Sequence, residues 1–513
     1  MTFRDPAMDV QEGRSGGPFR LLEDRRVQTI LLGILVATFA IFAGMQIASP
    51  DKRVIQVLAA MLLVFFAFRI DSVSALAIAT LLLPFPKATS YGNTNVTFVL
   101  LIFVVWLFRV STKRLPPPVR LPSMLPVLLL VMSYAISFYN VEYAHYAIAW
   151  AKFMAFLSYL FLAYLVVNVV RTEADVKKIF LAQLVSSVLV LSFGIYELNH
   201  PGGAIIPGWI EFTDTVKTGV GVRIGSTFLD YELFGEYCAL NLMFQIFLFT
   251  RATSKSRKFV LAGIMLLTFY CLFATVTRGA LLTMFVGLTY LTWMSRTRVT
   301  FPKLVIGVAG LVAVFAGGDF IVSSFSKSGS VLTRLEKTEF VGGVPDSRVG
   351  AWEYATKYIS QQPLIGHGTY YSIEKGLETK WWPHNVYLYY ASIVGLIGLA
   401  WYLWFLWEMF KLSRPRAPSL GEGSYLQGAR LAMRVMLVMF MADQLKIEYL
   451  RNERYSFFIW FFFGLVVAVS HAAQRESIAS NEGVLALPSS EPRRPTAVRS
   501  AVSARSAVLP GTR

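Results

Sequence analysis

The chain has 513 residues, of which 55% are hydrophobic and 15% are charged, and its mean hydropathy is +0.54. This composition excludes an ordinary soluble globular protein, in which roughly 25% of the residues are charged. The formal net charge of +17 would suit a nucleic-acid partner, but the basic residues are spread over short segments between apolar runs. We therefore expect a membrane protein with no nucleic-acid partner.

Apolar runs of about 18 or more residues recur along the sequence, and each is long enough to cross a bilayer as a helix. Uninterrupted apolar runs indicate helices, whose backbone hydrogen bonds are satisfied internally in hydrocarbon. We predict an all-α polytopic membrane protein with about 14 transmembrane helices and one large periplasmic loop containing short helices. In chain order the predicted helices span residues 28–48, 53–69, 72–87, 95–110, 124–141, 147–169, 177–197, 234–250, 258–276, 279–295, 302–317, 386–410, 430–447 and 455–472.

Lysine and arginine in short loops predict the orientation, because positively charged loops stay on the cytoplasmic side. If the spans alternate, one side of the bundle collects the basic loops around residues 109–120, 251–258 and 296–303. We therefore expect both termini in the cytoplasm. The long loops 198–233 and 318–385 then lie on the opposite side, where extracytoplasmic chemistry would take place.

These spans divide the chain into consecutive parts. Residues 1–26 are predicted to form a cytoplasmic N-terminal segment, and residues 27–317 to carry transmembrane helices 1 to 11. Residues 318–385 form the large periplasmic loop, and residues 386–472 carry helices 12 to 14. Residues 473–513 are rich in Ser, Ala, Pro and Arg with little apolar periodicity, which predicts a disordered cytoplasmic tail.

Three short stretches place charge where predicted helices meet the outer surface, which is costly unless a partner or a ligand is present. The first is an Arg-Gly-Ala stretch that begins at Arg278. The second contains Arg348, with a tryptophan four residues later, in the large loop. The third is a His-Asn stretch that begins at His384 and runs into the helix at 386–410.

Each stretch by itself also has a structural explanation. Arg278 would suit an arginine that snorkels to lipid headgroups, and Arg348 a surface salt bridge with Asp346 or Glu353. His384 would suit a structural group at the start of its helix. The chemical alternative is that arginine pairs two phosphate oxygens through its planar fork, while a neutral imidazole accepts a proton from a hydroxyl group.

Taken together and in this order, the stretches resemble the signature of the O-antigen ligase and O-antigen polymerase superfamily of bacterial membrane proteins. In that family an Arg-Gly-Ala stretch ends one helix, an Arg followed by Trp opens the large periplasmic loop, and a His-Asn stretch closes it before a Gly-x-x-Gly helix. Here the glycine pair is Gly395 and Gly398, which we also expect to form a close helix-packing notch. The Gly-Ser-Thr-Phe stretch at 225–228 resembles a further family element.

The resemblance implies a metal-independent, inverting glycosyltransferase that needs no cofactor. Arg278 and Arg348 would grip the pyrophosphate of an undecaprenyl-pyrophosphate-linked glycan, and His384 would orient or deprotonate the acceptor hydroxyl. The implied location is the bacterial inner membrane, with the active site on the periplasmic side. The implied partners are the lipid-linked glycan, membrane lipid and other polysaccharide assembly proteins.

Further charged residues near the outer surface form a group of acceptor or secondary site residues: Arg223, Glu232, Glu236, Lys446 and Arg451. Glu232 and Glu236 share a helix face, so they would bind acceptor sugar hydroxyls or neutralise Arg223, and we favour the pairing. Lys446 and Arg451 belong to the last outer turn. They would extend the phosphate site or anchor that turn at the membrane interface.

More than one function fits these features. We favour a polymerase of O-antigen or exopolysaccharide, because the early outer loop around Trp209 and Asp214 would cradle a second glycan. The alternative is a ligase that transfers the glycan to lipid A-core or protein. A flippase is more distant, since carriers usually show repeat symmetry and midplane polar residues. A transferase that uses carboxylates and a metal in its first outer loop is disfavoured, because the loop at 49–53 contains a single acid.

Overall fold

The computed structural model describes Phe65 and residues 67–89, 92–119, 123–207, 209–212, 221–294, 316–324, 329–336, 340–341, 344–369, 383–416 and 419–485. The predicted helices at 28–48, 53–69 and 302–317 lie wholly or mostly outside these residues. Every other predicted span coincides with a helix.

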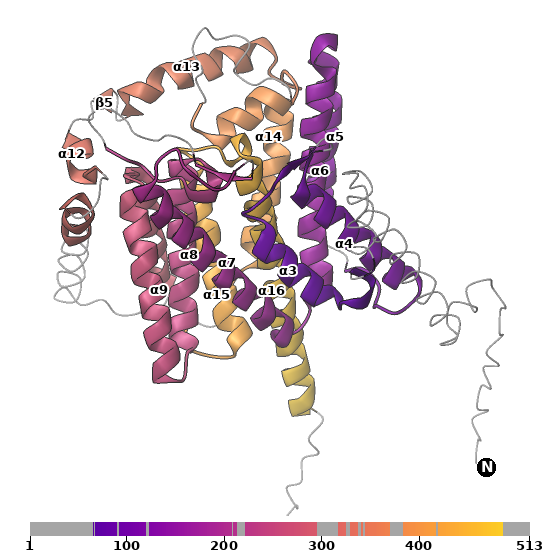
Figure 1. Ribbon diagram of the computed structural model, residues 1–513. Coiled ribbons are helices and arrows are strands. Elements are labelled where there is room, and N and C mark those ends of the chain that lie inside the picture. The colour runs from indigo at the N-terminus through magenta and orange to yellow at the C-terminus, as the bar shows by residue number, and fades with distance from the viewer. Residues whose placement is uncertain are drawn as a thin grey trace, which may run out of the picture.

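The fold is a bundle of long helices (Figure 1). The long helices are α3 (Ser72–Leu82), α4 (Thr94–Ser111), α5 (Met124–Ser137), α6 (Tyr146–Val169), α7 (Glu173–Asn199), α8 (Tyr231–Arg251), α9 (Lys255–Ala274), α10 (Arg278–Met294), α14 (Val386–Leu412), α15 (Tyr425–Asp443) and α16 (Glu453–Leu485). Two helices, α12 (Val331–Glu336) and α13 (Asp346–Gln361), belong to the large loop. The 3-10 helices are η2 (Phe138–Asn140), η3 (Tyr143–His145), η4 (Ser226–Phe228) and η5 (Tyr449–Arg451).

Strands contribute little to the described part of the chain. They form three antiparallel two-stranded hairpins, β1 (Ala88–Thr89) with β2 (Gly92–Asn93), β3 (Ala204–Ile206) with β4 (Ile210–Glu211), and β5 (Phe340–Val341) with β6 (Val344–Pro345). All three hairpins connect helices and none joins the bundle core.

Within the described residues, 7 helices are long and apolar enough to cross a membrane. They are α4, α6 with the preceding η3, α7, α8, α9, α14 and α16, while α3 and α5 are shorter apolar helices. The prediction of an all-α polytopic membrane protein is therefore confirmed. The total of about 14 spans stays a prediction.

The centre of the bundle is formed by α8 and α16. The most apolar windows of these helices are 78% and 94% buried, against 28% for α4 at the periphery. Two helices can approach closely where a small residue faces the neighbouring helix. Gly464 of α16 is such a residue, and it packs against Val166 and Ala163 of α6. Dense aromatic contacts, such as Phe405 stacked on Trp460, fill the remaining space.

The two ends of the bundle differ in charge. At one end, the basic residues bind loop carbonyl groups, as when Arg251 donates to the carbonyl oxygens of Glu422 and Ser424 at 2.8 Å each. At the same end Arg430 donates to the Leu412 carbonyl at 2.6 Å. The N-termini of α8, α10, α14 and α16 meet at the other end, where α13 lies across the bundle (Figure 1).

Helix α14 is broken at Gly395, where a loop from the α13 side packs into the break. Gly395 has φ +73°, and the peptide group of Leu396 donates to the Pro363 carbonyl at 2.8 Å. The backbone of Gly368 donates to the Ile393 carbonyl at 2.9 Å. The expected helix-packing notch is thus a notch for a loop at Gly395, whereas Gly398 faces Ser133 of α5.

The predicted start of the disordered tail is wrong. Helix α16 continues through Leu485, well past the expected end of the last span at 472. This extension packs against the N-terminal end of α15, where Gln427 donates to the Ala473 carbonyl at 3.2 Å and the N-cap residue Ser424 hydrogen-bonds Glu476. Tertiary contacts therefore stabilise a helix at residues 473–485, where the sequence has little apolar periodicity. Residues 486–513 lie outside the described residues.

We expect Gly395→Ala to destabilise the protein by at least about 2 kcal/mol, because a side chain there would strain the backbone and collide with a carbonyl group. A β-carbon on Gly395 would lie 2.0 Å from the Leu364 carbonyl oxygen. The measurement is the melting temperature of the purified protein. The matched control is Gly263→Ala on α9, where a β-carbon meets nothing within 4 Å. An equal melting temperature for both variants would contradict the packing described for Gly395.

Candidate active site

The site is built on the N-terminus of α8. Asp230 caps this helix, because its carboxylate accepts hydrogen bonds from the backbone of Glu232 at 2.9 Å and of Leu233 at 3.1 Å. The preceding turn is held by the buried Glu197, which accepts from the backbone of Gly225 at 2.9 Å and Ser226 at 2.6 Å. The cap and the buried carboxylate together fix the position from which Glu232 projects.

The turn before α16 is fastened to the same place. Asn452 donates to the Phe228 carbonyl at 2.5 Å, and Arg454 donates to the Thr227 carbonyl at 2.6 Å. These bonds bring η5, and with it Arg451, against the start of α8.

His384 reaches this end of the bundle through the cap of α14. Asn385 accepts from the backbone of Tyr387 at 2.9 Å and Leu388 at 3.1 Å, and its amide donates to the Leu445 carbonyl at 3.1 Å. His384 itself has φ +47°, a left-handed conformation that is uncommon for a residue other than glycine. The indole of Trp352 on α13 donates to the carbonyl of Pro383 at 2.8 Å, so α13 is bonded to the residue next to His384.

Two arginines and a histidine from three other segments converge on the carboxylate of Glu232. Its Oε1 lies 3.5 Å from Nη2 of Arg348. Its Oε2 lies 3.0 Å from Nη2 of Arg451 and 3.4 Å from Nδ1 of His384. Arg348 comes from α13, one helical turn before Trp352, so the same helix positions the arginine and the histidine loop.

Arg451 is the most enclosed cation of this group, with 9% of its side chain exposed. It binds Asp230 at 2.7 Å and Glu448 at 3.3 Å, and its Nη1 lies 3.2 Å from Nδ1 of His384. Burial lowers the pKa of Arg451, but Asp230, Glu448 and Glu232 outweigh it and raise that pKa above its ordinary value. Burial also raises the pKa of Glu448.

Lys446 and Glu236 form an adjoining polar layer. Lys446 pairs with Asp443 and donates to the Thr283 hydroxyl at 3.0 Å. Burial lowers the pKa of Lys446 to about 7, with the charge of Glu236 acting in the opposite direction. Glu236 accepts a hydrogen bond from Gln444 at 2.9 Å.

Arg223 is buried and supports the turn that precedes Arg278. Its guanidinium donates to the carbonyls of Thr275 at 3.0 Å and Val276 at 3.3 Å, and it stacks on the Tyr231 ring at 3.2 Å. The favoured pairing of Arg223 with Glu232 or Glu236 is therefore replaced by these contacts, because Glu232 faces Arg348, Arg451 and His384 instead. Arg278 begins α10 and is half-buried.

The structure thus brings together Arg348, His384, Glu232 and Arg451, which are distant in the sequence. The Lys446 side chain packs against Gly279, the residue that follows Arg278. A β-carbon added to Gly279 would lie 2.7 Å from Nζ of Lys446. Within the described residues, no group of three or more His, Cys, Asp and Glu side chains is arranged to hold a metal ion.

Sequence reasoning missed two positioning residues. Trp352 was noted only as part of a motif, although its indole bonds the residue before His384. The other is Glu197, an acid at the end of the predicted span 177–197, which accepts hydrogen bonds from the backbone of Gly225 and Ser226. Its position at the end of an apolar run was the available signal, because a buried acid needs hydrogen-bond donors.

A comparison with protein families matches part of the chain. Residues 263–403 match the family model described as O-antigen ligase. The match contains Arg278, Arg348 and His384, and it confirms the resemblance to the O-antigen ligase and polymerase superfamily. A comparison with curated proteins found no match.

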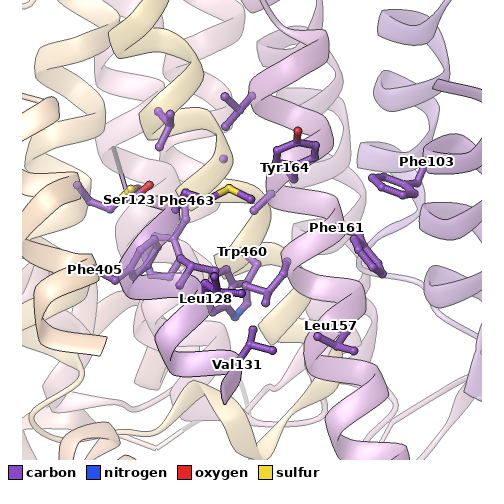
Figure 2. Close-up of a pocket in the computed structure, with 18 residues that line it drawn as sticks. Phe103, Ser123, Leu128, Val131, Leu157, Phe161, Tyr164, Phe405, Trp460 and Phe463 are labelled. Carbon is purple, nitrogen blue, oxygen red and sulfur yellow. The ribbon is translucent and has the colours of Figure 1, made fainter. Parts of the chain in front are cut away.

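An apolar pocket lies among the helices of the bundle (Figure 2). Its volume is about 390 Å³, and it is lined by side chains of α4, α5, α6, α14 and α16, among them Phe161, Phe405 and Trp460. Phe405 lies near the end of α14 opposite to His384. No side chain in this lining is charged, so the pocket suits an apolar chain.

We expect Arg451→Met to lower the stability by about 3–5 kcal/mol, because it leaves buried carboxylates without their shared cation. Thermal unfolding of the purified protein measures this loss. Acidic buffer should restore part of it, since protonated carboxyl groups no longer need the cation. The control is Lys152→Met, which removes a half-exposed partner of Glu453 at 3.4 Å and should cost about 0–1 kcal/mol. Equal losses in the two variants would contradict the role of Arg451.

Proposed function

We propose that this protein is a membrane glycosyltransferase that moves a glycan from undecaprenyl pyrophosphate to an acceptor hydroxyl at the periplasmic face of the bacterial inner membrane. One observation carries the proposal: an imidazole and a guanidinium that belong to the family match both lie within 3.5 Å of the Glu232 carboxylate. An anion-binding group and a proton acceptor are therefore adjacent at one end of a membrane bundle.

Arg348 and Arg278 are assigned to the diphosphate of the donor. A guanidinium pairs two phosphate oxygens and keeps its charge at any physiological pH. As the bond between the anomeric carbon and the diphosphate oxygen breaks, the departing diphosphate takes the bonding electron pair. The two arginines stabilise the negative charge that develops there.

His384 is assigned to the acceptor. The acceptor oxygen forms the new bond to the anomeric carbon while its proton passes to the free ring nitrogen of His384. Attack comes from the face opposite to the departing diphosphate, so the anomeric configuration inverts. In this mechanism, side chains of the protein bind the donor, orient the acceptor and take up its proton.

The distribution of charge supports the proposed side of the membrane. Arg251 and Arg430 mark the end of the bundle rich in basic loops, which the positive-inside rule assigns to the cytoplasm. The cluster at Glu232 lies at the opposite end, next to the N-terminus of α8. A flippase would be expected to carry its informative charges near the bilayer midplane, on broken helices.

The acceptor separates a polymerase from a ligase. We favour polymerisation, in which the acceptor is a further lipid-linked repeat unit, on the basis of the long outer loop before α8. In the described part of that loop, the Trp209 indole donates to the Phe85 carbonyl at 3.0 Å. Asp214 lies outside the described residues.

We expect His384→Ala, Arg278→Ala and Arg348→Ala each to reduce transfer by at least about 100-fold, as is usual when a general base or a charge-stabilising donor is removed. The readout is transfer from a purified polyprenyl-diphosphate glycan by the reconstituted protein. Arg416→Ala, which removes an exposed hydrogen bond to Ser477 at the opposite end, serves as a control. Full activity in any of the three variants would remove that residue from the mechanism.

Deletion of the gene tests the choice of acceptor. We expect single repeat units to accumulate on the lipid carrier, because a polymerase joins one repeat to the next. Gel analysis of the surface glycan measures chain length directly. Long carrier-bound chains that never reach their acceptor would instead identify a ligase.

A further inference from the structure

We propose that Glu232 holds Arg348 in place of the donor's diphosphate, and that donor binding releases this carboxylate to orient His384. The inference rests on the proposed function, and it names the residue that couples binding of the donor to activation of the acceptor. Glu232 is thus a positioning residue that acts through Arg348 and His384.

The contacts of Glu232 differ in how firmly they are held. The contact with Arg451 is 3.0 Å, and Arg451 is itself fixed by Asp230 and Glu448. The contact with Arg348 is 3.5 Å, longer than the 2.7–2.9 Å that is typical of a charge-assisted hydrogen bond. Arg348 is therefore the exchangeable partner. A diphosphate offers it two oxygens and a greater negative charge than one carboxylate.

The environment of Nδ1 of His384 contains two competing partners. Nη1 of Arg451 lies 3.2 Å away, and Oε2 of Glu232 lies 3.4 Å away. A guanidinium only donates, so beside Arg451 the Nδ1 atom accepts and the ring proton is on Nε2. A carboxylate only accepts, so beside Glu232 the proton is on Nδ1, and Nε2 has a free lone pair.

The second arrangement is the one that can receive a proton from the acceptor hydroxyl. When Arg348 moves to the diphosphate, Glu232 loses one cation and becomes a stronger acceptor for the N–H of His384. The imidazole keeps one proton throughout, and only the nitrogen that carries it changes. The other charged groups of the cluster, Asp230, Glu448 and Arg451, stay paired with one another.

Glu232→Gln separates binding from turnover. The neutral amide releases Arg348, so pyrophosphate should bind about five-fold more tightly, which corresponds to about 1 kcal/mol. The same variant should lower kcat about 100-fold, because the histidine loses the carboxylate that orients it. Loss of structure would weaken both properties, so tighter binding together with slower turnover distinguishes a positioning role from a structural one.

The test uses the full chain in nanodiscs. The Kd of inorganic pyrophosphate is measured by calorimetry for the wild type, Glu232→Gln, Arg348→Ala and the double variant. We expect Glu232→Gln to tighten binding in the wild-type background and to have no effect when Arg348 is absent. Equal tightening in both backgrounds would mean that Glu232 only repels the anion at a distance, and it would overturn the inference.

Two further variants make the result decisive. Glu453→Gln changes a half-exposed acid at the same end of the bundle, and it should leave both the Kd and kcat unchanged. Glu232→Asp keeps the negative charge but shortens the side chain and so weakens its contact with Arg348, which allows the same test if the glutamine variant does not fold. Unchanged or weaker pyrophosphate binding in the folded Glu232 variants contradicts the inference. Failure of the folded wild type to bind pyrophosphate contradicts the proposed function itself.

Discussion

The structure at the end of the bundle that carries the candidate site depends on a negative charge held at the start of α8. A carboxylate that is removed from water is costly unless cations or hydrogen-bond donors surround it. The side chain of Glu232 is 14% exposed, and Arg348, Arg451 and His384 supply that surrounding from α13, η5 and the approach to α14. Because attraction between charges is stronger in a poorly hydrated site, this carboxylate determines where three distant segments meet.

Contacts elsewhere in the fold fix the positions of Arg348 and His384 relative to each other. The break in α14 at Gly395 accepts the loop that follows α13, and Trp352 bonds the residue before His384. Both contacts fix α13 across the end of the bundle (Figure 1). A histidine and an arginine that are separated by a long loop therefore belong to one rigid arrangement. The apolar helices beneath it serve as the membrane support for a polar surface.

The sequence predicted the parts of this account that depend on local pattern. Apolar runs identified the helices, and motif order identified the family, because both signals are read along the chain. Contacts between distant segments were not predicted, since Glu232 was assigned to Arg223 and faces Arg348 instead. The break at Gly395 also has no local signal beyond a glycine that suits helix packing. The helical start of the tail depends on contacts with the N-terminal end of α15, which periodicity does not report.

The most direct measurement is an experimental structure of the full chain bound to inorganic pyrophosphate. The account predicts that the two phosphates contact Arg278 and Arg348, with the ring of His384 facing the same space. It also predicts that Glu232 has left Arg348 and hydrogen-bonds Nδ1 of His384. A structure in which Arg278, Arg348 and His384 point into separate spaces, or in which pyrophosphate binds elsewhere, would contradict it.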